Sequence, residues 1–145
     1  RENIDLEVIR LAAKAYADGG HPAADLSADA WGTQEWLYFL GELPVTLTAA
    51  RMGELDGRFN LSAQRNSEVL CAWLRLAIRH RYQAALPALE RFLSSQGRRK
   101  FLRPLYEELF AQPWEQADAR RIYARARPLY HAVVTATLDP LLLSA

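Results

Sequence analysis

The sequence predicts an all-α protein of about eight helices, arranged as a helical layer or solenoid. Three observations support this fold class. Apolar residues recur at spacings of three and four, which is the pattern of one helix face. No stretch shows a convincing two-residue alternation of the kind that strands have. Short breaks separate the helical segments without a fixed repeat length, so we expect an irregular array of the armadillo or HEAT type.

The first part of the chain predicts three helices, over residues 6–17, 34–43 and 48–55. Apolar residues at helical spacing from Leu6 to Tyr16 define the first helix, and "DGG" at 18–20 ends it. The loop that follows contains one helical turn. We expect Thr33 to cap the second helix and Pro44 to follow its end. "DGRFN" at 56–60 is expected to end the third.

The clearest helix is "NSEVLCAWLRLAIRHRY", residues 66–82. Asn66 or Ser67 caps it, and Glu68 suits its first turn because the helix dipole favours a negative charge there. Arg75 and Arg79 lie on a different side from its apolar face. That face consists of Val69, Leu70, Trp73, Leu74, Ala77 and Ile78.

Four more helices are predicted over residues 83–97, 98–111, 115–127 and 128–138. Pro87 is tolerated because it stands near the first turn of its helix, and Gly97 suits the position just after the end of that helix. Pro104 lies inside the next helix. That helix is therefore expected to bend, or to lose a hydrogen bond, near Phe101.

The composition is typical of a soluble globular domain, with 50% hydrophobic and 24% charged residues among 145. A net charge of +1 argues against nucleic acid or a membrane as a partner, so any anion site must be local. No apolar run approaches the ~20 residues of a membrane span. The single cysteine, Cys71, excludes an internal disulfide and leaves cytoplasm and periplasm equally open.

Residues that could carry catalysis are sparse. The histidines, His21, His80 and His131, are scattered, and none is followed by glutamate as in H-E-x-x-H. Three histidines and one cysteine offer no local ligand spacing, so no metal site is expected in this chain. Cys71 is interpreted as a small core residue. Nucleophile-elbow and phosphate-loop motifs are absent, so no catalytic residue is predicted.

Three consecutive cations, Arg98, Arg99 and Lys100, open the predicted helix after Gly97. The partial positive charge of a helix N-terminus opposes each of them by roughly 0.3–1 kcal/mol. One interpretation is a site for a carboxylate or phosphate, since a charge-assisted hydrogen bond contributes ~1.5–3 kcal/mol. The other is a solvated turn, or ion pairs with Glu107 and Glu108.

The remaining charged and aromatic residues indicate no second site. Glu115 and Asp118 lie near a group of arginines that we interpret as a solvated face, with a phosphate-binding stripe as the alternative. These arginines are Arg120, Arg121, Arg125 and Arg127. The tryptophans are expected to pack rather than to stack on bases, given the near-neutral charge. They are Trp31, Trp36, Trp73 and Trp114.

Residues 66–109, together with residues 130–138, also carry a resemblance to a known family. The features are the "NSE" cap with "WLRL", a proline early in the next helix, "QGR-x-KF", "RPL", and the closing "YHAVVTATL". Their order and spacing are similar to those of the C-terminal domain of leukotriene A4 hydrolase and related bacterial zinc aminopeptidases. The resemblance is good over residues 43–140 and loose before them. Since the chain begins with Arg1 rather than methionine, we expect a fragment or a processed product.

The resemblance implies a single all-helical domain over residues 1–145, folded as a two-layered, solenoid-like helical coil. This domain is expected to lie behind a zinc-bearing catalytic domain that this chain lacks. In that family the domain walls the substrate channel, and an "R-x-K" pair binds the free carboxylate of a short peptide or of a lipid epoxide. These roles fall on Arg98 and Lys100. Arg99 is a further cation between them, which leaves open which two of the three face the channel.

Two whole-protein hypotheses follow. In the first, the chain is a domain of a zinc aminopeptidase, inactive alone, whose partners are its own catalytic domain and a peptide substrate. In the second, it is a free-standing helical interaction module of the same fold. An H-E-x-x-H motif encoded upstream of Arg1 would favour the first.

Overall fold

The computed structural model describes residues 5–144, and every regular element within that range is a helix. It contains eight α-helices joined by turns and five short 3-10 helices. The prediction of an all-α protein with eight helices is thus confirmed. The chain divides into two compact units, Arg1–Tyr82 and Gln83–Ala145, which are described separately.

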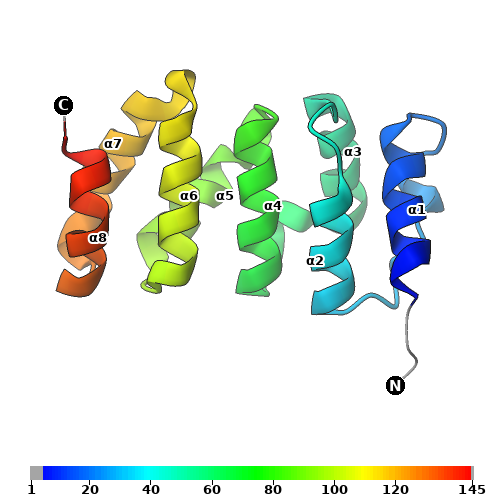
Figure 1. The fold of residues 1–145 in the computed structure, drawn as a ribbon, viewed down its shortest axis with the longest axis horizontal. Coiled ribbons are helices and arrows are strands. Elements are labelled where there is room, and N and C mark those ends of the chain that lie inside the picture. Colours follow the sequence, from blue (N-terminus) through cyan, green and yellow to red (C-terminus); the bar gives the residue numbers. More distant parts are fainter. Residues whose placement is uncertain (1–4, 145) are drawn as a thin grey trace. The chain divides into compact units, whose positions relative to one another are not determined.

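The first unit contains four α-helices in two layers. They are α1 (Leu6–Ala17), α2 (Thr33–Glu42), α3 (Ala49–Phe59) and α4 (Ser67–Arg79). Figure 1 shows α1, α2 and α4 in a row, with α2 in contact with both neighbours. Helix α3 lies behind that row and packs on the short helices η1 (Ala23–Asp25) and η2 (Leu61–Ala63).

Large side chains fill the core of the first unit, as their helical spacing predicted. Trp73 is fully buried, and its indole N–H donates to the hydroxyl of Ser62 at 3.0 Å. Trp36 contacts Phe39 and Phe59 edge to face. The tryptophans at 36 and 73 therefore pack in the core, where burial of such aromatic side chains contributes strongly to stability.

Two helix ends in the first unit differ from the prediction. Thr33 is the first residue of α2 rather than its cap; the cap is Gly32, whose N–H donates to the Glu35 carboxylate at 2.7 Å. Helix α3 does not stop at Leu55 but continues to Phe59 and ends at Asn60 in the left-handed conformation. The helix is favoured beyond Leu55 because the carboxylate of Asp56 accepts hydrogen bonds from Ser62 and Tyr82.

Asp56 connects the end of α3 to later parts of the first unit. Its carboxylate accepts hydrogen bonds from the N–H of Ser62 at 2.8 Å, the Ser62 hydroxyl at 2.7 Å and the Tyr82 hydroxyl at 2.7 Å. Charge-assisted bonds of this kind outweigh the ~1 kcal/mol that Gly57 costs inside a helix. Asn66, not Ser67, caps α4, with Oδ1 accepting from the Val69 N–H.

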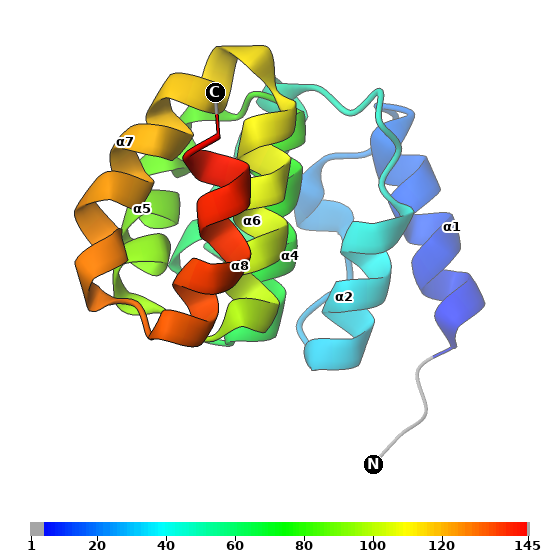
Figure 2. The same ribbon diagram turned by 60° about the vertical axis from the view of Figure 1, so that its left-hand side comes forward.

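The second unit also has two layers. It comprises η3 (Gln83–Ala85), α5 (Leu86–Ser95), α6 (Arg99–Ala111), η4 (Pro113–Glu115), α7 (Gln116–Ala126), η5 (Arg127–Leu129) and α8 (Ala132–Leu142). Helices α5 and α7 pack together in one layer, and α6 and α8 in the other (Figure 2). Between the layers, the hydroxyls of Tyr106 and Tyr130 lie 2.9 Å apart, and Tyr130 donates to the Leu93 carbonyl.

Three features of the helices in the second unit differ from, or refine, the prediction. Gly97 follows α5, but it does not adopt a left-handed conformation, because α5 ends through an extended Gln96. Helix α6 runs through Pro104, which lacks the N–H that would bond to the carbonyl four residues earlier. Helix α8 begins only after His131, whose ring nitrogen accepts from the Val133 N–H; residues 128–130 lie outside it.

Candidate functional site

The turn between α5 and α6 is held in place by Gln96. Its side-chain oxygen accepts hydrogen bonds from the N–H groups of Gly97 at 3.1 Å and Arg98 at 3.0 Å. Arg98 then occupies the position before α6, and its carbonyl accepts from the N–H of Phe101 and of Leu102. No side chain caps this helix start. The three cations therefore stand where the sequence placed them, at the N-terminus of a helix.

The three cations are exposed but not equivalent. The guanidinium carbon of Arg98 lies 5.4 Å from the centroid of the Phe101 ring, and the ammonium nitrogen of Lys100 lies 5.0 Å from it. Arg99 instead donates from Nη1 to the hydroxyl of Thr137 on α8 at 3.2 Å. Arg98 and Lys100 thus share one aromatic ring, whereas Arg99 is directed to another helix.

The pairing of these cations with Glu107 is not found. Glu107 accepts a hydrogen bond from Nε of Arg103 at 3.2 Å, on the same helix. Within residues 5–144, neither Arg98 nor Arg99 forms an ion pair with a carboxylate. Of the two interpretations of the basic turn, the structure therefore excludes neutralisation by Glu107 and keeps both the solvated turn and the anion site.

Three of the four arginines near the C-terminus, Arg120, Arg121 and Arg127, are bonded to other groups of the fold. Arg121 bridges Glu90 at 2.7 Å and Asp118 at 3.3 Å, and this contact lowers the pKa of the Glu90 carboxyl. Arg127 bonds to both oxygens of Asp139. A continuous phosphate-binding stripe is therefore not supported. Arg120 donates to the carbonyls of Leu142 and Ser144.

Glu115, which stands near the arginines that we interpreted as a solvated face, is itself buried. It is only 3% exposed, and its Oε2 has no hydrogen-bond partner among residues 5–144. A carboxyl oxygen that is buried without a partner costs free energy, because its hydration is lost and nothing replaces it.

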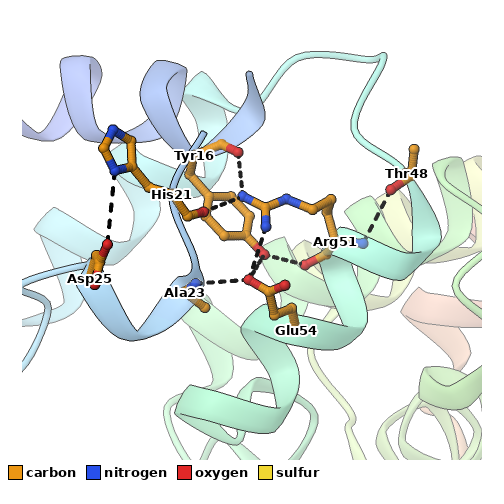
Figure 3. Close-up of polar contacts among 7 residues, drawn as sticks. All are labelled: Tyr16, His21, Ala23, Asp25, Thr48, Arg51 and Glu54. Carbon is orange, nitrogen blue, oxygen red and sulfur yellow. Dashed lines mark hydrogen bonds and ion pairs between the residues drawn. The ribbon is translucent and has the colours of Figure 1, made fainter. Parts of the chain in front are cut away.

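A second polar cluster, centred on Arg51 of α3, had no signal in the sequence beyond the three-residue spacing of Arg51 and Glu54. Figure 3 shows the Arg51 guanidinium donating to the carbonyls of Tyr16 and His21, each at 2.6 Å, and to Glu54 at 2.9 Å. Glu54 also accepts from the N–H of Ala23 at 2.8 Å. These partners are carbonyls and a carboxylate of the fold itself, so the cluster ties α1 and the loop after it to α3.

An apolar groove lies beside this cluster. Its volume is about 460 Å³. His21 and Asp25 form its polar edge, where Nδ1 of His21 lies 3.8 Å from Oδ2 of Asp25. Val8 is 60% exposed along it, and Leu11 on the same helix is 51% exposed. Its remaining lining is Ile9, Ala12, Ala15, Tyr16, Leu26, Ser27, Ala30 and Trp31.

The residues with metal-binding or nucleophilic chemistry stay apart. Within residues 5–144, no group of three or more histidine, cysteine, aspartate or glutamate side chains could hold a metal ion. His80 is the C-cap residue of α4, and His131 is the N-cap residue of α8. Cys71 is buried, as predicted. No described helix is long and apolar enough to cross a membrane.

Comparison with known proteins gives consistent matches. A family model described as "Leukotriene A4 hydrolase, C-terminal" matches residues 31–142. The leukotriene A-4 hydrolase of Xenopus laevis is 34% identical over 91 residues, which are 63% of this chain and 14% of that protein. The leucine aminopeptidase 2 of Pyricularia oryzae is 24% identical over 137 residues, which are 92% of this chain and 22% of that protein. The chain thus spans a small part of the length of these relatives.

Proposed function

Because the chain belongs to the family of leukotriene A4 hydrolase C-terminal domains, we propose that it forms one wall of the substrate channel of a zinc aminopeptidase. In this proposal Arg98 and Lys100 bind the free carboxylate of a short peptide. The domain does not cut the peptide itself. Its own catalytic domain, in the full-length protein, is its partner.

One observation carries the assignment of residues. Arg98 and Lys100 lie against the same ring at a helix start that no side chain caps, and Arg98 is bonded to no carboxylate within residues 5–144. Two cations held together repel each other, and both gain when an anion docks between them. The N-terminus of α6 adds partial positive charge, which favours the same ligand.

The zinc ion of such an enzyme would have to be held elsewhere. The described residues of this chain do not fit it, because they bring together no ligand set. When bound in a catalytic domain, zinc would polarise the scissile carbonyl and lower the pKa of a bound water. The contribution proposed for this chain is to hold the far end of the peptide. A fixed C-terminus places the scissile bond at a constant distance from the catalytic groups.

The test uses the full-length protein that carries this domain. Arg98→Ala and Lys100→Ala should each lower kcat/KM for short peptides by roughly ten- to hundredfold, which corresponds to the loss of one charge-assisted bond of ~1.5–3 kcal/mol. C-terminally amidated peptides lack the carboxylate and should lose much less. Zinc content should stay constant. Arg103→Ala is the matched control, because Arg103 is an exposed cation of the same helix that is already bonded to Glu107.

Equal losses on acid and amide peptides would contradict carboxylate recognition by this pair. A full-length protein without peptidase activity, in which this chain binds another protein, would instead favour the free-standing interaction module.

A further inference from the structure

We infer that Phe101 and Thr137 sort the three cations of the basic turn: the Phe101 ring gathers Arg98 and Lys100 into one carboxylate-binding pair, and Thr137 holds Arg99 apart. This inference rests on the proposed function, which it deepens by naming the residues that select the pair. Phe101 and Thr137 are positioning residues, because they are argued to act through the cations and not on the peptide.

The Phe101 ring is fixed by the core and not by the cations. Its residue is 3% exposed, and the ring meets Phe92 of α5 edge to face, with the centroids 6.0 Å apart. The face of an aromatic ring carries partial negative charge, which attracts a cation within about 6 Å. Both Arg98 and Lys100 lie within that distance. A rigid ring therefore attracts both cations, Arg98 and Lys100.

Thr137 is oriented to accept a hydrogen bond rather than to donate one to the turn. Its hydroxyl donates to the carbonyl of Val133, one turn earlier on α8, at 3.3 Å. The oxygen lone pairs are then available to Arg99, whose Nη1 lies 3.2 Å away. A guanidinium has no acceptor, so the direction of this bond is unambiguous. Arg99 is thereby drawn to α8 although it stands between the other two cations in sequence.

The consequence is selectivity for one ligand geometry. A carboxylate presents two oxygens in one plane, which suits two donors that lie close together. Three freely moving cations would attract any anion by charge alone. A sorted pair with a third cation held aside should prefer a single carboxylate at one place on the turn.

The first measurement tests the sorting without any ligand. In the 145-residue chain, side-chain NMR resonances of Arg98 and Lys100 should be shifted by the ring current of Phe101. Phe101→Leu should return both toward their ordinary positions and leave Arg99 unchanged. Thr137→Val should move the Arg99 resonances alone. Unshifted Arg98 and Lys100 resonances in the wild-type chain would overturn the inference.

The second measurement titrates the same variants with an acetylated dipeptide, as the free acid and as the amide. Phe101→Leu should weaken binding of the acid about three- to fifteenfold, as expected from the loss of cation–π contacts to two cations. Phe101→Tyr keeps the ring and should restore wild-type affinity. Thr137→Val and Arg99→Gln should each change the affinity by less than about twofold, since Arg99 is outside the pair.

The outcomes distinguish a failure of carboxylate binding by the turn from a failure of the sorting role of Phe101. If the wild-type chain does not prefer the acid over the amide, carboxylate binding by the turn fails, whatever the ring-current shifts show. If the wild-type chain prefers the acid and Phe101→Leu binds it equally well, the sorting role fails alone. Equal losses in Phe101→Leu and Phe101→Tyr would mean that Phe101 is only structural. Should Phe101→Leu not fold, the ring-current shifts of Arg98 and Lys100 in the wild-type chain and the Arg99 resonances in Thr137→Val still decide the inference.

Discussion

The hydroxyl of Tyr16 on α1 donates to the main-chain carbonyl of Arg51 on α3 at 2.6 Å, while the guanidinium of Arg51 lies 3.7 Å from the centroid of the Tyr16 ring. The guanidinium also donates to the main-chain carbonyl of Tyr16, so three contacts join the two residues. Because the residues are 35 positions apart, this reciprocal contact joins two helices that the sequence leaves unconnected.

Replacing Arg51 should weaken the first unit. We expect Arg51→Ala to lower the free energy of unfolding by about 2–4 kcal/mol, since it removes charge-assisted bonds to two carbonyls and a ring contact. Urea denaturation measures this directly. Arg58→Ala, at an exposed position of the same helix, is the control and should cost less than about 0.5 kcal/mol. Similar losses in both variants would contradict a special role of the contact.

Alkaline pH should destabilise the protein through two tyrosines with raised pKa values, Tyr16 and Tyr82. Burial raises the pKa of Tyr16 to about 12, and burial together with the Asp56 hydrogen bond raises the pKa of Tyr82 to about 12. The neutral phenols are favoured in the fold, so their contribution is complete below the unfolded pKa of about 10. It is lost as the pH rises from there toward 12. Ultraviolet titration of phenolate, compared with Tyr82→Phe, checks this; titration of all tyrosines near 10 in the folded protein would contradict it.

Acid should weaken the second unit through Asp139. Hydrogen bonds from Arg127 and Tyr123 lower the pKa of Asp139 to about 2. A lowered pKa means that the contribution is present above the unfolded value near 4 and disappears as the pH falls toward 2. The urea midpoint should therefore drop over that range. Asp139→Asn should start from a lower midpoint and show a smaller drop; an equal pH dependence in the variant would assign the effect to other carboxyls.

Glu115 should be a position where a substitution stabilises the protein. Its buried Oε2 lacks a partner within residues 5–144. Glu115→Gln keeps the shape of the side chain and removes a buried carboxyl, so we expect a gain of about 1 kcal/mol in the free energy of unfolding. Thermal and urea denaturation at neutral pH measure it. A loss of 1 kcal/mol or more would show that the carboxyl has a stabilising partner in solution.

The exposed apolar side of α1 should make the chain associate weakly with itself. Val8 and Leu11 are more than half exposed beside the apolar groove, whereas the turn at residues 97–100 carries exposed cations. Contiguous apolar patches of this kind usually mark interaction sites. Sedimentation across a concentration series should show association that Val8→Lys with Leu11→Gln abolishes. Association that persists in this double variant would place the contact elsewhere.

Helical periodicity predicted every α-helix, because each buries one apolar face and local spacing records that face. The positions of the helix ends were harder to predict than the helices themselves. Thr33 has a good capping side chain, but Glu35 reaches back to Gly32 and caps α2 from inside the helix. The end of α3 depended on the bonds of Asp56 to Ser62 and Tyr82, which local sequence does not record.

The candidate site was predictable in part. Its place at a helix start followed from three adjacent cations after Gly97, and the choice of Arg98 and Lys100 came from the family resemblance. What sequence could not supply was the difference among the three cations, since that difference arises from Phe101 beneath two of them and from Thr137 on α8.

Gly97 offers a practical opportunity. Its backbone is not in the left-handed region, and a side chain added there would meet nothing within 4 Å. The position therefore tolerates other residues, although it adjoins the basic turn. Because Cys71 is the single natural thiol and is buried, Gly97→Cys would introduce one accessible thiol. A fluorophore or spin label attached to it would report the arrival of a peptide at the turn and would leave unchanged Arg98 and Lys100, the cations that we propose bind the peptide carboxylate.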